Sequence, residues 1–240
     1  MQPDGVLPNH EVHVWHAALV VPEQGIDSLL DLLDAQERDR ASRFKLHAPR
    51  YQFILSHAFL RSALGLYLDI PARNLRFVTG GNGKPALADG HELKFNLSHS
   101  GGAAVLAIAR NRELGVDIER IREDVNALDL AQRFFSAPEV EWLKSQPAST
   151  LRSAFFSCWT AKEAYVKACG EGLSLPLSGF GVVSPSTGND LKLQIYGDAT
   201  ESRRWSVRPL DLGPDFRAAL AVEGENWQLQ VGQWPVSLRE

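Results

Sequence analysis

Three carboxylates in two segments of this chain have types and spacing that suit a hard metal ion. Asp117 and Glu119 lie two residues apart inside an apolar run, and Glu163 lies between Lys162 and Lys167. Oxygen ligands of this kind suit a divalent cation such as Mg²⁺. Because lysines beside such a cation suit phosphate oxygens, the two segments together predict a metal-assisted reaction on a phosphate compound.

The acid pair is expected on a strand over residues 114–119. Residues i and i+2 of a strand share one face, so Asp117 and Glu119 should project together while Val116 and Ile118 turn toward a core. A half-exposed strand with its polar residues outward gives the same pattern. Two neighbouring acids repel each other unless water or a cation lies between them, and this favours a site while the simpler interpretation stays open.

Glu163 is expected on a helix over residues 150–169, where neighbours lie three and four residues apart. There it interrupts a stripe that contains Phe156, Trp159 and Val166. A carboxylate in such surroundings needs a partner. Lys167, at i+4, could supply it as a plain helix salt bridge, and a metal ion that bridges this helix to the acid pair is the competing interpretation.

Two other segments offer groups that could bind a phosphate. The glycine-dense turn around Lys84 is not a Walker loop, because Val78 stands where the first glycine belongs and Pro85 replaces the Ser or Thr. Neighbouring Ser98 and His99 offer donors, but adjacency alone does not make a catalytic dyad. Taken alone, the first segment is a turn, and the second is equally a turn or a site.

The remaining pattern mixes strands and helices in both halves, so the predicted fold class is α+β. Helices are predicted over 26–44, 49–68, 127–135, 138–143 and 150–169. Strands are predicted over 12–20, 93–97, 103–109, 114–119, 180–183, 191–196, 205–207, 217–222 and 227–231. Charge and asparagine at 110–113 interrupt the apolar strands. We therefore expect two α+β lobes, over 1–110 and 111–240, with the site between them, since pockets favour domain interfaces.

Composition limits the class of protein. The 240 residues are 44% hydrophobic and carry a net charge of −4, so no global positive field recruits nucleic acid. The sequence has no basic-then-apolar leader, and no apolar run approaches the ~20 residues that cross a bilayer. The two cysteines, Cys158 and Cys169, predict neither a zinc site nor a disulfide framework. A cytoplasmic protein that binds no nucleic acid and no membrane is expected.

Six segments stand in a characteristic order. They are Gly83-Lys84-Pro85, Phe95-Asn96-Leu97-Ser98-His99-Ser100, Gly115-Val116-Asp117-Ile118-Glu119, Arg133-Phe134-Phe135-Ser136, the run 159–167 from Trp159 to Lys167, and Gly172-Leu173-Ser174-Leu175-Pro176-Leu177. Together they resemble the 4′-phosphopantetheinyl transferases of the Sfp type, over roughly residues 30–183. The combination is far more specific than any single segment.

The resemblance implies a pseudo-dimer of two similar α/β lobes with coenzyme A held between them. Such an enzyme moves the 4′-phosphopantetheine arm of coenzyme A to a serine of an apo acyl or peptidyl carrier protein. It depends on Mg²⁺ and releases adenosine 3′,5′-bisphosphate. A monomer is expected, because one chain carries both lobes.

The resemblance also implies catalytic roles. Asp117, Glu119 and Glu163 would hold Mg²⁺ against the pyrophosphate of coenzyme A. Lys162 and Lys167 would neutralise charge on its phosphates. Glu163 would act as general base on the carrier serine, with Lys162 as its competitor for that role.

Further residues are implied in coenzyme A binding. Ser98 and His99 would contact its phosphates, Gly83, Lys84 and Pro85 would lie against the adenine and the 3′-phosphate, and Arg40, helped by Arg43, would reach the 3′-phosphate. His57 stands where many relatives carry arginine. Two rivals stay open: a Mg²⁺-dependent phosphohydrolase acting on nucleotides, and a catalytically silent module that binds coenzyme A or a carrier protein. Consumption of coenzyme A with and without a carrier protein separates them.

Overall fold

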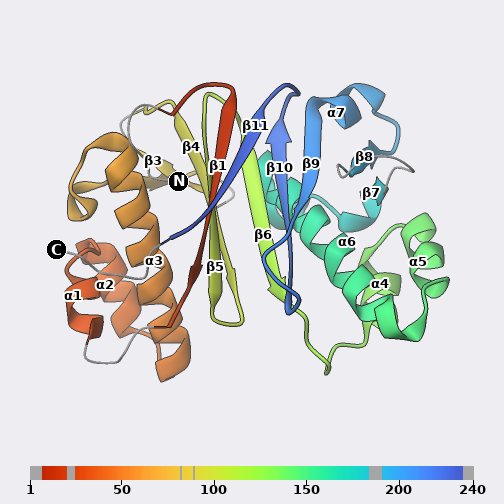
Figure 1. The fold of residues 1–240 in the computed structure, drawn as a ribbon, viewed down its shortest axis with the longest axis horizontal. Helices are drawn as coiled ribbons and strands as arrows, with labels where there is room; N and C mark the ends of the chain where they lie inside the picture. The colour runs from red at the N-terminus through yellow and green to blue at the C-terminus, as the bar shows by residue number, and fades with distance from the viewer. Residues whose placement is uncertain (1–6, 21–24, 82, 89, 184–190, 235–240) are drawn as a thin grey trace.

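Two sheets stand face to face at the centre of the molecule, and helices cover their outer sides (Figure 1). The computed structural model describes residues 7–20, 25–81, 83–88, 90–183 and 191–234. Apolar side chains of both sheets form the core between them. The layers therefore run helix, sheet, sheet, helix. The predicted α+β class is confirmed, and the likeness of the two lobes to each other stays a prediction.

The first sheet is mostly N-terminal. Its order is β11 (Gln228–Gln233), β1 (Glu11–Ala18), β5 (Ala103–Arg110) and β4 (Leu93–Ser100). β5 pairs antiparallel with both β1 and β4, whereas β11 pairs parallel with β1, with Val231 opposite Val14. The last strand of the expected C-terminal lobe thus crosses to the N-terminal sheet, which the expected boundary between 1–110 and 111–240 does not anticipate.

The second sheet carries the acid pair. It is antiparallel, in the order β6 (Leu114–Arg120), β10 (Phe216–Glu223) and β9 (Trp205–Leu210). Two short hairpins complete the strands: β2 (Phe77–Thr79) with β3 (Pro85–Leu87), and β7 (Phe180–Val183) with β8 (Lys192–Ile195). The turn around Lys84 is therefore the connection of a hairpin, of which residue 82 lies outside the described chain.

Helices cover each sheet on its outer side. On the N-terminal side these are α1 (Ile26–Leu30), α2 (Ala35–Ser42) and α3 (His47–Leu68). On the other side α6 (Ala148–Cys169) packs on the second sheet, with α4 (Ala127–Phe134) and α5 (Ala137–Lys144) against it and the short α7 (Ala199–Arg204) near β8 and β9. No helix among the described ranges is long and apolar enough to cross a membrane.

The single helix predicted over 26–44 is wrong, because α1 ends at Leu30 and a second helix, α2, begins after its N-cap residue Asp34. The Asp34 side chain accepts the Glu37 amide at 2.9 Å, and the Glu37 carboxylate accepts the Asp34 amide at 3.1 Å. This reciprocal capping box begins a new helix. Arg61 of α3 is fully buried and pairs with both acids, so the break is also held from the core.

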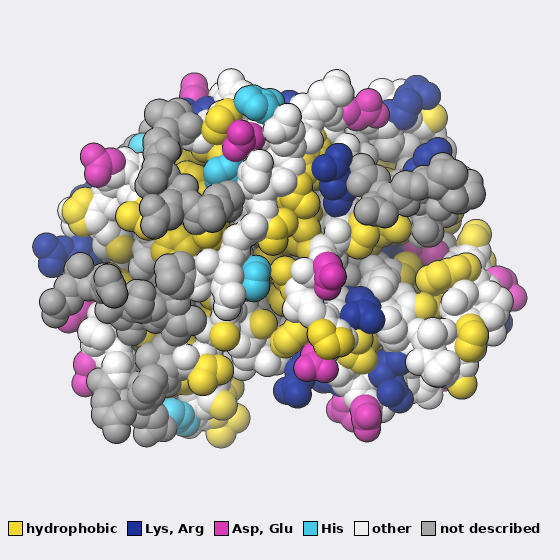
Figure 2. Space-filling model, viewed as in Figure 1, with side chains coloured by type: hydrophobic (Ala, Val, Ile, Leu, Met, Phe, Trp, Pro, Cys, Tyr) yellow, Lys and Arg dark blue, Asp and Glu magenta, His cyan; other side chains and the backbone are white. Residues whose placement is uncertain are grey.

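Charges of both signs are mixed on one face of the molecule. On the face shown in Figure 2, acidic and basic side chains are interspersed, and neither sign covers the face. On this face, any field that attracts a charged partner must therefore be local.

Candidate active site

Asp117 and Glu119 project from β6 toward helix α6, as the strand pattern predicts. Val116 and Ile118 belong to the core between the two sheets, so the acids occupy the opposite face of the strand. The second sheet therefore presents its carboxylates to the helix that carries Glu163.

Gly115 brings that helix into direct contact with the strand. A Cβ built at this glycine would lie 2.2 Å from the carbonyl oxygen of Ala164 and 2.3 Å from the amide nitrogen of Ala168. Any larger residue would meet helix backbone. The missing side chain thus lets the backbone of α6 lie directly on β6.

Polar side chains of β4 join the first sheet to the second. The backbone amides of Val116, Ile118 and Arg120 donate to Asn96 Oδ1 at 2.9 Å, Ser98 Oγ at 3.4 Å and Ser100 Oγ at 3.2 Å, respectively. The two hydroxyls also donate, Ser98 to Asp117 Oδ1 at 2.9 Å and Ser100 to Glu119 Oε2 at 2.7 Å. Alternate residues of β4 therefore replace a backbone ladder and orient both acids.

Asp117 is buried and only half satisfied. Its Oδ1 accepts from Lys167 Nζ at 2.6 Å and from Ser98, whereas its Oδ2 is buried without a hydrogen-bond partner among the described residues. Burial raises the pKa of Asp117, although Lys167 and Ser98 pull that pKa down. Lys167 thus pairs with Asp117, and the helix salt bridge to Glu163 expected at i+4 is not the bond it makes.

Glu119 and Glu163 are also partly buried, and neighbouring carboxylates act on the pKa of each. Burial raises the pKa of Glu119, and the charge of Asp117 raises it further, against the hydrogen bond from Ser100. Burial likewise raises the pKa of Glu163, and Asp117 and Glu119 add to the rise while Lys167 opposes it. The three carboxylates therefore act on one another across the junction of β6 and α6.

The residues fit a cation in chemistry, without forming a closed cage. An unpartnered buried carboxylate oxygen and mutual repulsion among acids are both relieved by a bound divalent ion. Across the ranges that the structure describes, no three or more His, Cys, Asp or Glu side chains are drawn together as a metal site. The metal-binding roles of Asp117, Glu119 and Glu163 stay a prediction.

Lys162 lies outside this cluster. It is fully buried, and its Nζ lies 2.8 and 2.7 Å from the two carboxylate oxygens of Glu139 and 2.5 Å from the carbonyl oxygen of Phe180. Burial lowers the pKa of Lys162, and Glu139 opposes that change. Contact with a phosphate or with a serine proton, as expected for this lysine, does not match these surroundings.

Lys84 and Ser98 are also engaged within the protein. Lys84 Nζ donates to Glu113 Oε2 at 3.1 Å and to the carbonyl oxygens of Leu114 and Ala168 at 3.0 Å each. It therefore ties the β2–β3 hairpin to β6 and to the end of α6. Ser98 is buried with its hydroxyl between Asp117 and Lys167. Either residue could contact coenzyme A only if these bonds broke.

His99, which follows Ser98 on β4, is exposed. Partial burial lowers the pKa of His99, and the charges of Lys167 and His57 lower it further. His57, on α3, donates from Nδ1 to Glu37 Oε1 at 2.8 Å. The charges of Lys167 and His57 therefore both act on His99.

The expected 3′-phosphate residues lie on or near α2. The Arg40 guanidinium lies over the Phe53 ring, 5.1 Å from its centre, and Arg43 pairs with Asp39. The His57 ring lies tilted against the same Phe53 ring, with the two ring centres 4.0 Å apart. Gly83 has a φ of +87° and precedes Pro85, the exposed first residue of β3. Their roles toward coenzyme A stay predictions.

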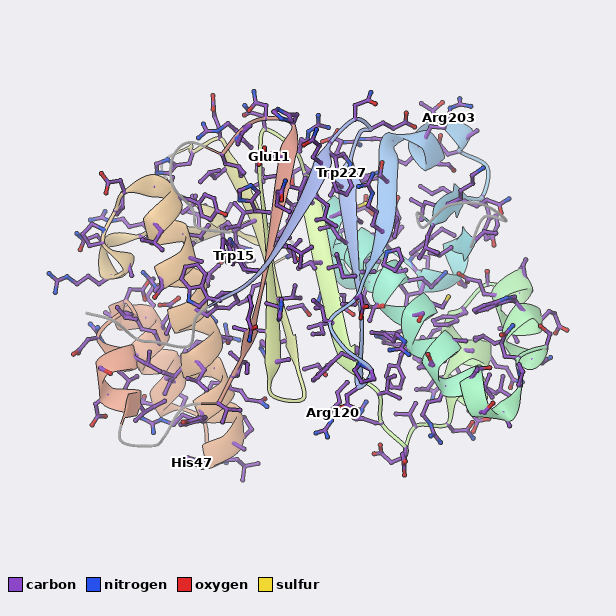
Figure 3. All side chains as sticks on the ribbon, in the orientation of Figure 1. Glu11, Trp15, His47, Arg120, Arg203 and Trp227 are labelled. Atoms are coloured by element: carbon purple, nitrogen blue, oxygen red, sulfur yellow. The ribbon has the colours of Figure 1, made fainter. Side chains whose placement is uncertain are left out.

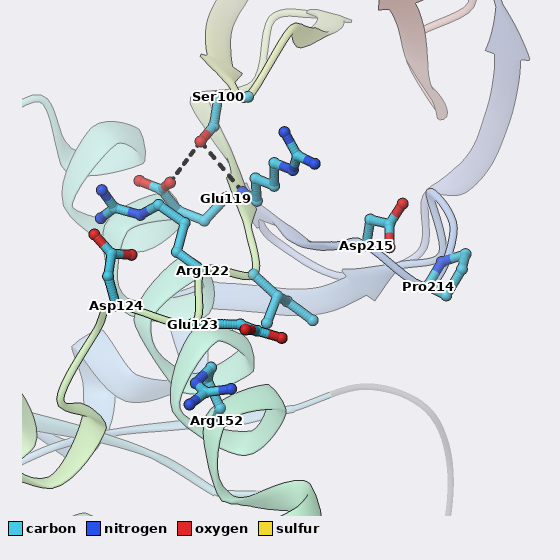
Figure 4. Close-up of a pocket in the computed structure, with 11 residues that line it drawn as sticks. Ser100, Glu119, Arg122, Glu123, Asp124, Arg152, Pro214 and Asp215 are labelled. Carbon is cyan, nitrogen blue, oxygen red and sulfur yellow. Dashed lines mark hydrogen bonds between the residues drawn. The ribbon is translucent and has the colours of Figure 1, made fainter.

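An open cavity of about 1020 Å³ lies beside the acids. Glu119 and Ser100 form its inner side, and Arg122 and Arg152 face it from the loop after β6 and from α6 (Figure 4). Figure 3 shows Arg120, the last residue of β6, at this end of the molecule. The cavity gives Glu119 access to solvent, so a substrate can reach the cluster from this side.

Sequence reasoning missed three residues that shape the site. Gly115 and Asn96 belong to segments that the sequence analysis singled out. The signal for Gly115 is a residue without a side chain on a buried strand, and the signal for Asn96 is a polar residue in an apolar strand. Glu139 is a capping-box acid, three residues after Ser136, but its pairing with a lysine 23 residues later has no local signal.

Comparisons with known proteins agree along most of the chain. Residues 113–222 match the family described as 4′-phosphopantetheinyl transferase superfamily, and residues 22–111 match 4′-phosphopantetheinyl transferase, N-terminal. The chain is 37% identical over 231 residues to the 4′-phosphopantetheinyl transferase HetI of Nostoc sp., covering 94% of this chain and 93% of that protein. It is 33% identical to a putative 4′-phosphopantetheinyl transferase of Synechocystis sp. (75% and 73% covered) and 30% identical to Sfp of Bacillus subtilis (65% and 68% covered).

Proposed function

This chain belongs to the 4′-phosphopantetheinyl transferase superfamily, and we propose that the junction of β6 and α6 is where it catalyses phosphopantetheine transfer. The protein is a transferase that moves the phosphopantetheine arm of coenzyme A to a carrier protein. The observation that carries the site is Asp117, a buried carboxylate with one oxygen unpartnered among the described residues and with Glu119, Glu163 and Lys167 around it.

The proposed reaction joins the serine oxygen of an apo acyl or peptidyl carrier protein to the β-phosphorus of coenzyme A. The bond from that phosphorus to the bridging oxygen breaks, and adenosine 3′,5′-bisphosphate leaves with the electron pair. Asp117, Glu119 and Glu163 would hold Mg²⁺, which supplies a Lewis acid and a template for in-line attack when bound. Lys167 moves its positive charge from Asp117 toward the phosphates as the substrate enters.

Glu163 takes the serine proton in this proposal. Burial and its acidic neighbours raise the pKa of Glu163 in the protein without metal, whereas Mg²⁺ held by the same carboxylate would lower that pKa. Lys162 was the competing candidate from sequence. Its ammonium is closed in by Glu139 and Phe180, and this supports Glu163.

The test is the mass of a carrier protein after incubation with coenzyme A, Mg²⁺ and enzyme. We expect a gain of one phosphopantetheine, abolished by EDTA and reduced at least 10³-fold by Glu163→Gln, in the range for loss of a base and a metal ligand together. The matched control is Glu141→Gln, which removes an exposed acid on α5 and should keep wild-type activity.

The binding-module alternative and the phosphohydrolase alternative predict different results. A silent module would bind coenzyme A without adding mass to any of several acyl and peptidyl carriers. A phosphohydrolase would consume coenzyme A with no carrier present. Full activity of Glu163→Gln would leave the transferase assignment intact but would remove Glu163 from its mechanism.

A further inference from the structure

We propose that Lys162 and Glu139 form a buried positioning pair that fixes helix α6 and, through it, the placement of Glu163. The inference rests on the proposed function, in which Glu163 touches the metal and the serine proton. Lys162 precedes Glu163 on α6, yet it makes three contacts with acceptors inside the protein, two to Glu139 and one to the carbonyl oxygen of Phe180. An ammonium has three donors, so all of them are used.

Glu139 is equally saturated. Besides Lys162, its carboxylate accepts from the amide and hydroxyl of Ser136 at 3.0 and 2.7 Å and from the Val182 amide at 2.8 Å, and the Cys158 thiol lies 3.4 Å away. These donors come from the start of α5, from α6 and from β7. The Glu139 carboxylate therefore joins α5, α6 and β7. Of its two partners on α6, Lys162 is charged and Cys158 is not.

The helix is thereby held on two sides. On one side its backbone lies on β6 at Gly115, and on another Lys162 is locked to α5 and β7. Consecutive helix residues point ~100° apart, so Lys162 turns into the lock while Glu163 turns along the adjacent face. A side chain reaches ~5–6 Å from a helix axis, so a rotation of ~10° displaces its end by ~1 Å.

Such a displacement matters because the chemistry depends on position. A misplacement of ~1 Å can cost ~10²-fold in rate. Lys162 fully buried against Glu139 also means that either charge would be left uncompensated in the interior without the other. The pair therefore holds the orientation of α6 without touching the substrate.

The experiment is a double-substitution cycle in the full-length chain. Lys162→Met and Glu139→Gln are made singly and together, each keeping nearly the native volume. For each variant, Tm is measured with kcat and KM for coenzyme A, at a temperature well below every Tm. Leu29→Ala, a fully buried residue of α1 far along the chain, is the control for general loss of stability.

We expect both single variants to lose about 10- to 100-fold in kcat, with KM for coenzyme A within twofold of wild type. The double variant should regain most of the lost Tm and kcat, because no unpaired charge remains buried. Leu29→Ala should lower Tm and keep kcat. A fall in kcat in both single variants, with KM unchanged and with the kcat of Leu29→Ala retained, is a result that a merely stabilising pair would not give.

Four results would overturn the inference. Wild-type kcat in Glu139→Gln would show that the pair does not position the helix. A double variant with recovered Tm but the kcat of Lys162→Met would show that Lys162 itself acts on the substrate, as would a tenfold rise in KM confined to Lys162→Met. Equal kcat loss in Leu29→Ala would reduce the effect to stability. If the double variant stays unstable, kcat and KM of the single variants decide.

Failure of the proposed function has a different signature. Glu163→Gln, measured beside the cycle, should be inactive whatever the pair does. Full activity of Glu163→Gln would refute the proposed role of Glu163, while an inactive Glu163→Gln beside a fully active Glu139→Gln would refute only the positioning role.

Discussion

Substitution of Gly115 by alanine directly tests whether the approach of α6 to β6 sets the geometry of catalysis. The new Cβ would lie 2.2 Å from the carbonyl oxygen of Ala164 and 2.3 Å from the amide nitrogen of Ala168, whereas ordinary contact begins at 3.4 Å. Both atoms belong to helix backbone, which cannot turn aside as a side chain can. The helix must therefore move away from the strand by about 1 Å.

The expected loss follows from that displacement. Moving α6 carries Glu163 away from Asp117, and a misplacement of ~1 Å costs about 10²-fold in rate. Overpacking of a well-packed contact costs about 1–3 kcal/mol in the free energy of unfolding. In a domain of about this length, each kcal/mol lowers Tm by roughly 2–4 °C. Gly115→Ala should thus remain folded at 15 °C with kcat reduced about 100-fold.

The assay is the rate at which an apo carrier protein gains mass, with Tm measured on the same sample. Gly81→Ala is the matched control, because a Cβ at that glycine meets nothing within 4 Å; it should keep wild-type kcat. A Gly115→Ala protein with kcat within twofold of wild type would refute the reasoning. It would mean that the helix position does not limit the chemistry.

Three further predictions concern charges. Burial and the charge of Asp117 raise the pKa of Glu163, so the folded state binds the proton of Glu163 more tightly than the unfolded state does. The free energy of unfolding therefore falls as pH rises through the pKa of Glu163. Glu163→Gln should raise Tm by roughly 2–4 °C at pH 8, with the gain absent at pH 4. An equal gain at both pH values would contradict this. Lys84→Met removes the hydrogen bonds that join the β2–β3 hairpin to Glu113 and to α6. It should lower the free energy of unfolding, measured in urea, by about 1–3 kcal/mol and leave KM for coenzyme A within twofold of wild type. An unchanged stability with a tenfold higher KM would instead show that Lys84 contacts the substrate. Arg61→Met leaves Glu37 without its buried partner and should lower the free energy of unfolding by about 3–5 kcal/mol in the same measurement. A loss below about 1 kcal/mol would show that the pair is not a determinant of the N-terminal fold.

Local patterns predicted most of the elements because the relevant signals are local. The apolar run 103–109 predicted a strand, which the structure has as β5, and alternation at β6 placed both acids on one face. The break at Asp34 also had a local signal, since Asp34 and Glu37 have capping-box spacing, and the longer apolar periodicity concealed it. The pairing of β11 with β1 had none, because a strand's pattern does not specify which edge it joins.

The candidate site likewise has features with a local sequence signal and features without one. Strand periodicity places Asp117 and Glu119 on one face, as predicted, and the charges of Glu163 and Lys167 act on them from α6, while the shared metal role of the three acids stays a prediction. Lys162 is one residue from Glu163 in sequence and belongs to a different environment in the fold. A rotation of 100° between consecutive helix positions separates the two, and only the packing of α5 and β7 reveals where the second face lies.

The buried charged side chains of this protein differ in how completely they are hydrogen-bonded. Lys162 and Arg61 are fully buried and surrounded by acceptors that use their donors. Asp117 is nearly as buried, yet Lys167 and Ser98 satisfy only one of its oxygens. Since an unpaired buried polar atom is costly, a fold able to complete such pairs elsewhere retains the imbalance at Asp117 where a ligand can relieve it. Incomplete pairing, more than the mere presence of acids, supports the proposal that chemistry takes place at the junction of β6 and α6.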